Sequence, residues 1–268
     1  MPATAQVSAS AAPLLAQLRI TGTDARKFLQ GQLSNDMQLL APDRMLCAGL
    51  HTPQGRVLAV LQMCTSGADD IVALLPEDLA AIAAAALTRF ILRAKVKIAV
   101  EPAESTLCAL PGAPASTVAQ KIHAIAQGLP QVYAASSGQF IAQMLNLDML
   151  QAIAFDKGCY TGQEVIARAH YRGRVKRRMQ RFATDATLSL PPGAALRLRD
   201  GRNALLVDNV ILENGGCEFL AVTTVPGLAT TDEAASRTEV GDPQVSASNT
   251  DAQLIACVQL PLPYALPK

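Results

Sequence analysis

The chain has 268 residues; half are hydrophobic, 17% are charged, and the formal net charge is +1. This composition excludes wholesale disorder, which needs low hydrophobicity and high net charge, and it does not favour a globally basic nucleic-acid binder. The sequence has no closely spaced cysteine pair and no run of 18 apolar residues, so it predicts neither a zinc ribbon nor a membrane-spanning helix. Because no secretory signal is visible, we expect a cytoplasmic protein with reduced thiols.

The first hundred residues predict an α+β unit with an antiparallel sheet. A helix is expected after Thr23 or Asp24, and a second one starts at Pro76 and ends near Phe90. Apolar runs of strand length precede, separate and follow these helices, at 14–20, 45–50, 57–63, 71–75 and 94–100. The order β-α-β-β-β-α-β favours an α+β fold. Residues 1–13 are rich in Ala, Ser and Pro and are expected to be disordered.

The remainder predicts a short helical region and then a small β domain. Helical spacing of apolar residues indicates helices over 118–125 and along 140–150. Two hairpin-type dipeptides, Asp200-Gly201 and Asn214-Gly215, then flank a predicted strand. Further strands are expected at 219–225 and 254–260, the second closing a small β-barrel. We therefore divide the chain into residues 1–13, 14–179 and 180–268.

One stretch concentrates residues suited to chemistry: Lys157-Gly158-Cys159-Tyr160-Thr161-Gly162-Gln163-Glu164, called the octet below. Its two glycines permit tight turns and close approach of a ligand. Lys157 is placed to lower the pKa of Cys159 and favour the reactive thiolate, and Gln163 and Glu164 suit the polar edge of a heterocycle. The alternative is a turn before a helix, with Cys159 as a small buried hydrophobic residue.

The next stretch, residues 165–181, is strongly basic and has no acid. Arg172, Arg174 and Lys176 alternate, so a strand here would point all three to one side. Such a row suits phosphates, carboxylates or an RNA backbone, and the alternative is a solvated strand face. Its seven cations are Arg168, Arg172, Arg174, Lys176, Arg177, Arg178 and Arg181.

Two other sets of residues are weaker candidates. Asn35 and Asp36 follow the first predicted helix and either face a cleft or form a plain helix C-terminal turn. His51, His123 and His170 lack the spacing of metal ligands, so we predict no metal site and expect surface or satisfied core histidines.

The octet, followed by Ala167-Arg168 and Arg172-Gly173, resembles the signature of the YgfZ family of folate-binding proteins. These proteins are similar to the aminomethyltransferase, or T-protein, of the glycine cleavage system. Shorter matches extend the resemblance over about residues 14–266; they are Ile20-Thr21-Gly22, Phe28-Leu29-Gln30-Gly31-Gln32, Pro53-Gln54-Gly55-Arg56, Ser137-Gly138-Gln139-Phe140, Asn146-Leu147 and Pro261-Leu262-Pro263-Tyr264.

The resemblance implies T-protein-like antiparallel α+β subdomains around a central folate pocket, with a C-terminal β-barrel. It implies tetrahydrofolate as cofactor and a role in assembling or repairing iron–sulfur clusters, including those of radical tRNA-modifying enzymes. Partners would be the client proteins and the assembly machinery, with tRNA affected only indirectly and no membrane involved. The family's cysteine and lysine correspond to Cys159 and Lys157. Folate contacts are expected from Asn35, Asp36, Tyr160, Gly162, Gln163, Glu164, Arg168, Arg172 and Arg174.

The chain departs from the family in two respects. Family members usually have a longer middle region, whereas here residues 101–132 fill that space. Some members place Trp against the folate, and this chain has no Trp. Leu15 and Gln120 align near those positions, so they would line the pocket with weaker stacking on the pterin.

Three functions follow from these observations. The first is a folate-dependent accessory factor for iron–sulfur proteins without ordinary turnover. The second is a folate-dependent aminomethyl- or methyltransferase, which needs an acid at the folate's reactive nitrogen, for which Asp36 and Glu164 are the candidates. The third is a non-catalytic RNA-binding module that uses the basic stretch.

Overall fold

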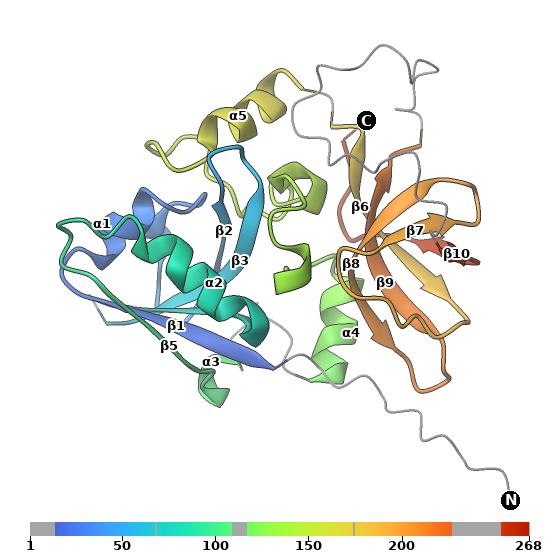
Figure 1. The fold of residues 1–268 in the computed structure, drawn as a ribbon, viewed down its shortest axis with the longest axis horizontal. Coiled ribbons are helices and arrows are strands. Elements are labelled where there is room, and N and C mark those ends of the chain that lie inside the picture. Colours follow the sequence, from blue (N-terminus) through green and yellow to red (C-terminus); the bar gives the residue numbers. More distant parts are fainter. Residues whose placement is uncertain (1–13, 68, 109–116, 174, 227–252, 268) are drawn as a thin grey trace, which may run out of the picture.

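The computed structural model describes residues 14–67, 69–108, 117–173, 175–226 and 253–267. Its N-terminal half is built on a five-stranded, fully antiparallel sheet in the order β2-β3-β4-β1-β5 (Figure 1). The elements occur in the predicted order β-α-β-β-β-α-β, and the α+β class is confirmed. Their bounds are β1 (Leu15–Thr21), α1 (Ala25–Gln30), β2 (Leu46–His51), β3 (Val57–Gly67), β4 (Asp70–Pro76), α2 (Glu77–Thr88) and β5 (Lys97–Pro102). The predicted disordered residues 1–13 lie outside the described residues.

Helix α2 covers one face of this sheet. It begins directly after Pro76, whose fixed φ suits a helix start, and Glu77 and Asp78 place negative charge at its N-terminus. Its buried side chains pack against β1, β4 and β5, and they are Leu79, Ala80, Ala83 and Leu87. The core of the N-terminal half therefore lies between α2 and the sheet.

Short helices connect the two halves. They are the 3₁₀ helix η1 (Met37–Leu39), α3 (Ser105–Cys108), α4 (Val118–Ala126), η2 (Ala134–Ser136) and η3 (Ala142–Leu145). Helix α4 confirms the prediction over 118–125. The helix expected along 140–150 is wrong, because Asn146 adopts a left-handed φ of 57° and ends η3 after one turn. The buried Asn146 amide donates to the Met179 carbonyl and so fastens this turn to the following half.

The C-terminal half is one curled sheet in the order β10-β7-β8-β9-β6-β11. Both predicted hairpins form: Gly201 and Gly215 take φ values of 87° and 83°, which only glycine adopts readily. The strands are β6 (Arg177–Thr184), β7 (Ala195–Leu198), β8 (Asn203–Ile211), β9 (Cys217–Thr224), β10 (Gln253–Ile255) and β11 (Val258–Leu260).

The predicted barrel is a half-barrel, and its predicted closing strand at 254–260 is wrong. That segment forms two short strands, β10 parallel to β7 and β11 antiparallel to β6, at opposite edges of the sheet. Only residues 256 and 257 separate them, so the two edges lie within about 11 Å of each other. This link curls the sheet strongly without a hydrogen-bonded ladder across the gap (Figure 1).

Buried polar contacts join the two halves. Lys121 of α4 forms an ion pair with Asp208 of β8 at 3.0 Å, and the Tyr133 hydroxyl also lies 3.0 Å from Asp208. Arg178 of β6 makes two 2.9 Å contacts with the Asp148 carboxylate. Within the described residues, no helix is long and apolar enough to cross a membrane.

Candidate functional site

The octet forms the turn that leads into helix α5 (Gln163–Tyr171), and Gly162 fixes this turn against the β2–β3 hairpin. Gly162 has a φ of 84°, and a Cβ built on it would lie 2.6 Å from the Thr52 carbonyl oxygen and 3.2 Å from the Gly55 Cα. Gly55 is equally constrained, since its φ is 73° and its Cβ would meet Val165 at 2.9 Å. The two backbones can approach this closely only because both residues are glycines.

Lys157 fastens the other end of the octet to helix α1. Its ammonium donates to the carbonyl oxygens of Gln30, Leu33 and Asn35, each at 2.7 Å. An ammonium has three N–H donors, and these three bonds use all of them. The acceptors follow the C-terminus of α1, where a cation is also favoured by the helix dipole. Lys157 thus connects segments more than 120 residues apart.

The charge of Lys157 is partly shielded from water. Burial lowers the pKa of the Lys157 ammonium to about 8, and the nearby Asp36 carboxylate opposes that shift. The ammonium also lies 5.2 Å from the centroid of the Tyr160 ring, within cation–π range. Its hydrogen bonds go to backbone carbonyls, so its clearest role here is to hold the loop.

Tyr160 and Gln163 complete the loop. Tyr160 is buried, and this burial raises the pKa of its hydroxyl to about 12. Its backbone N–H donates to the Gln163 side-chain oxygen at 3.1 Å, which closes the turn before α5. The Thr161 hydroxyl reaches the Gln32 side chain at 3.4 Å. The octet is therefore held at both ends and in its centre.

Asn35 and Asp36 lie beside the octet, where the Asn35 carbonyl accepts from the Lys157 ammonium. The buried Asn35 amide donates to the carbonyls of Cys47 and Gln151 at 2.7 and 2.9 Å, and its oxygen accepts from the Asp36 N–H. Asp36 is half-buried and accepts from the Gln38 N–H at the start of η1. Asn35 has no spare donor, whereas Asp36 keeps a second carboxylate oxygen.

Cys159 is the exposed thiol among the five cysteines that the structure describes. The alternative that it is a small buried hydrophobic residue is therefore wrong, although the turn before a helix is confirmed. Burial raises the pKa of the other four thiols, to about 12 for Cys47 and upward also for Cys64, Cys217 and Cys257. Those four stay protonated at neutral pH and are poor nucleophiles.

The basic stretch does not form the expected strand at residues 172–176. Helix α5 continues to Tyr171, and β6 begins only at Arg177. A Cβ on Gly173 would lie 3.0 Å from the backbone of Ala169, so a larger residue would be crowded just after the helix end. Glu164, Arg168 and Arg172 are exposed on or just after α5. Arg174 lies outside the described residues.

Two of these arginines are free to meet a ligand. The side chains of Arg168 and Arg172 make no hydrogen bond or ion pair with any residue that the structure describes. Beside them, Phe155 and His170 stack with ring centroids 3.8 Å apart, and Tyr171 lies edge-on to both. Tyr171 is 68% exposed. Exposed aromatic rings and unpaired cations thus occur together at the C-terminal end of α5.

Leu15 and Gln120 lie on other elements. Leu15 is half-buried at the start of β1, opposite Pro76 of β4. Gln120 lies in the first turn of α4, which packs on β8 and β9. A pocket that included both would extend from the octet to the contact between the two halves of the molecule.

His51 and Gln143 were missed by the sequence reasoning, which expected a surface or satisfied histidine at position 51. His51 is buried at the end of β2, 6.4 Å from the Tyr160 ring, and neither ring nitrogen has a hydrogen-bond partner among the described residues. Gln143 donates to the Ile166 carbonyl of α5, but its own oxygen is unpartnered. No local pattern marks either residue, because their burial depends on the octet folding over them.

Comparison with known proteins gives the family. No protein-family model matches the chain. The tRNA-modifying protein YgfZ of Escherichia fergusonii is 30% identical over 241 residues, which cover 69% of this chain and 74% of that protein. The YgfZ protein of Escherichia coli K12 matches with the same identity and coverage. This chain belongs to the YgfZ family.

The fold of this YgfZ-family chain is also that of a T-protein. The crystal structure of the glycine cleavage system aminomethyltransferase T from Bartonella henselae superposes with a TM-score of 0.59 and covers 78% of this chain and 76% of its own. The two sequences are only 11% identical, so this likeness concerns the fold. The family resemblance inferred from the octet is confirmed.

Proposed function

We propose that this chain is a cytoplasmic, folate-binding accessory protein that supports the assembly or repair of iron–sulfur clusters, including those of radical tRNA-modifying enzymes. One observation carries the proposal: the octet is anchored by Lys157 and Gly162, yet it leaves the Cys159 thiol exposed. The name of the relatives, tRNA-modifying protein, agrees with client enzymes that act on tRNA. In this proposal, tRNA itself is affected only through those clients.

The residues around the octet suit a reduced folate. Such a ligand combines a heteroaromatic ring rich in donors and acceptors with an anionic glutamate tail. Unpartnered buried atoms of His51 and Gln143 lie behind the octet, and the unpaired Arg168 and Arg172 lie on α5. The last two residues would match the tail, whereas the first two are buried and would support the octet from behind. When bound, tetrahydrofolate would supply a carrier of one-carbon groups.

The predicted folate contacts then separate into two kinds. Asp36 and Gln163 carry polar groups beside the octet, and Tyr160 adds a buried ring. Asn35 and Lys157 have their donors committed to backbone carbonyls, so they would shape the site from behind. Cys159 would act on the client side, because a thiolate is a soft ligand suited to iron and sulfur.

A complementation experiment tests the role of Cys159. In cells lacking their own YgfZ, Cys159→Ala should abolish support of iron–sulfur enzymes while leaving the melting temperature of the purified protein nearly unchanged. Cys257→Ala is the matched control, since this thiol is partly buried and its variant should complement fully. Full complementation by Cys159→Ala, or a native Cys159 thiol inert to a small alkylating agent, would overturn the proposal.

A second candidate function, RNA binding, is favoured by the aromatic cluster of Phe155, His170 and Tyr171 beside Arg168 and Arg172. Aromatic rings next to cations form stacking platforms for single-stranded nucleic acid. If the surface serves RNA, binding should weaken steeply with salt and with Tyr171→Ala. RNA affinity that is independent of salt and of Tyr171 would exclude this candidate.

A further inference from the structure

Strand β5 forms a free edge of the N-terminal sheet, at the end away from β2 (Figure 1). It pairs with β1 on one side, and none of the other described strands pairs with it. All six of its residues are at least partly exposed. An edge strand of this length presents a row of N–H and C=O groups on which another strand can pair.

The surface beside this edge combines apolar and charged side chains. A groove of about 580 Å³ lies along it, and its lining consists of Arg19, Thr21, Thr88, Ile91, Val96, Lys97, Ile98, Ala99 and Glu101. Val100 of β5 is exposed, and so are Phe90 and Leu92 in the segment between α2 and β5, with Leu92 88% exposed. Exposed apolar side chains of this size are found at interaction surfaces.

We propose that this edge pairs with β5 of a second copy of the chain, antiparallel, about a twofold axis that passes midway between Ala99 and Ala99 of the partner subunit. In this register Ala99 faces Ala99 of the partner subunit, Ile98 faces Val100 of the partner subunit, and Lys97 faces Glu101 of the partner subunit. Each contact other than that on the axis occurs twice, because a twofold interface is isologous.

Charge selects this register from its neighbours. Side chains alternate between the two faces of a strand, and directly opposed residues have their side chains on the same face. A twofold axis perpendicular to the sheet must therefore pass midway between a residue and the same residue of the partner subunit. Centring on Lys97 or Glu101 would oppose like charges, and centring on Ile98 or Val100 would set a charge against Ala99. Only the Ala99 register sets Lys97 against Glu101, and it leaves the smallest side chain on the axis.

The Lys97 ammonium and the Glu101 carboxylate are both available for an ion pair across this interface. The Lys97 ammonium has no partner among the residues that the structure describes. Glu101 accepts one bond, from the Gln17 amide to Oε2 at 3.0 Å, and its Oε1 has no partner among the described residues. The neighbouring Arg19 donates its hydrogen bonds to both oxygens of Asp70, although its charge also attracts Glu101. Cross-strand pairs of opposite charge and of β-branched residues are favourable, so the strand complements itself.

The first test is a charge exchange, measured on the full chain by sedimentation over a dilution series. Lys97→Glu and Glu101→Lys should each weaken dimerisation about tenfold or more, because each creates two like-charge pairs. The double variant should restore most of the lost affinity. Lys95→Glu is the matched control, since it changes the same charge just outside β5 and should leave the dimer unaffected.

The second test uses a cysteine on the axis in a chain that also carries Cys159→Ala. Ala99→Cys should form a disulfide-linked dimer on mild oxidation, whereas Arg93→Cys, exposed but outside β5, should not. A chain that is monomeric at every concentration would overturn the proposal. So would a dimer that ignores the charge exchange and does not cross-link through position 99. Neither test measures complementation or needs the Cys159 thiol, so its result is independent of the proposed function.

Discussion

The octet with helix α5 and the C-terminal sheet both rely on polar side chains, but they connect them differently. In the sheet, three arginines are paired with acids: Arg178 with Asp148, Arg181 with Glu218 and Arg202 with Asp200. On α5, Arg168 and Arg172 have no partner among the described residues. The same sequence stretch, 165–181, thus supplies structural cations in β6 and available cations in α5.

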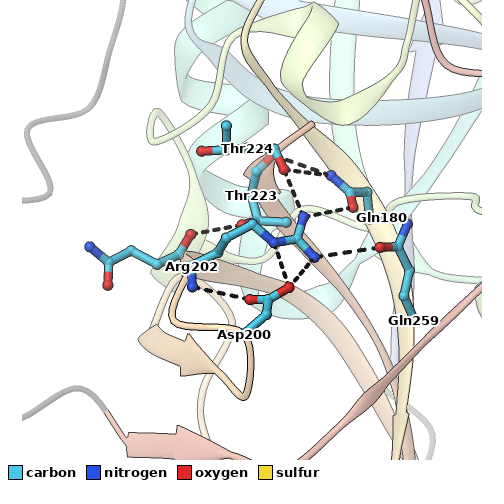
Figure 2. A network of polar contacts seen from close by, with 7 residues as sticks. Gln180, Asp200, Arg202, Thr223, Thr224 and Gln259 are labelled. Atoms are coloured by element: carbon cyan, nitrogen blue, oxygen red, sulfur yellow. Dashed lines mark hydrogen bonds and ion pairs between the residues drawn. The ribbon is translucent and has the colours of Figure 1, made fainter. Parts of the chain in front are cut away.

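Figure 2 shows how completely the C-terminal sheet satisfies one of these cations. The Arg202 guanidinium donates to the Thr224 carbonyl at 2.7 Å, to the Asp200 carboxylate at 2.8 Å and to the Gln180 and Gln259 side chains at 3.2 and 3.4 Å. These partners belong to β6, β11, the end of β9 and the β7–β8 turn. The network joins the β7–β8 turn to β9, β6 and the edge strand β11.

The octet is held in place by contacts that leave its reactive thiol available. Lys157 is held by backbone carbonyls and Gly162 by close backbone packing, so neither anchor needs a neighbouring acid. Cys159 remains exposed, and the ring nitrogens of His51 remain unpartnered. In this molecule, polar side chains whose hydrogen bonds are all satisfied have structural roles. Those with unsatisfied hydrogen-bonding groups are the candidates for binding.

The largest expected effect comes from breaking the octet's backbone packing. Gly162→Ala should lower the free energy of unfolding by about 3–5 kcal/mol, because it combines a left-handed φ with a Cβ 2.6 Å from the Thr52 oxygen. Urea unfolding would measure it. Gly201→Ala is the control: its φ is similar but nothing lies within 4 Å, so it should cost only about 1–2 kcal/mol. Equal losses would show that the octet is not packed as described.

The next prediction compares one anchor from each region. Arg202→Met and Lys157→Met should each lower the free energy of unfolding by about 2 kcal/mol, because each leaves several acceptors without their donor. Only Lys157→Met should also reduce complementation, since it releases the loop that carries Cys159. A functional loss with Arg202→Met would contradict the separation between the two regions.

The third prediction concerns pH. Burial lowers the pKa of His51 to about 3, against about 6.5 for an exposed histidine. Below pH 6.5 the His51 side chain is protonated in the unfolded chain but stays neutral in the folded chain. The free energy of unfolding therefore falls as the pH falls. The cost is about 2 kcal/mol at pH 5 relative to pH 8. His51→Leu should remove this part of the acid sensitivity, measured by urea unfolding at both pH values.

The exposed His123 provides the control for this measurement. His123→Gln should leave the acid sensitivity of the wild type unchanged. If His51→Leu is as sensitive to acid as the wild type, the His51 ring is not buried and unpartnered, and its assignment behind the octet is wrong.

Local signals in the sequence predicted most elements but not their limits. Pro76 and the acids after it predicted the start of α2, and Asp200-Gly201 and Asn214-Gly215 predicted two hairpins, because these signals act over a few residues. The alternation at 172–176 was misleading. It resembles a strand, but helix α5 continues to Tyr171 and strand β6 begins only at Arg177.

The candidate site was predictable only in part. The residue types of the octet predicted Cys159 and Lys157 as candidate site residues. The carbonyls that bind Lys157 lie more than 120 residues away, and carbonyls leave no trace in a sequence. His51 and Gln143 were invisible for a similar reason, since their burial arises only when distant segments meet.

The smallest expected effect tests whether the unpaired cations of α5 serve the ligand. Arg168→Gln with Arg172→Gln should weaken binding of a polyglutamyl folate about three- to tenfold, because exposed charge pairs contribute less than about 1 kcal/mol each. A monoglutamyl folate has fewer carboxylates to lose and should weaken less. Calorimetry with both ligands would measure the difference, and raising the salt concentration should reduce it. Arg197→Gln, an exposed change in the C-terminal sheet, should affect neither ligand. Equal losses for the two folates would mean that these arginines serve another partner, such as the RNA of the second candidate function.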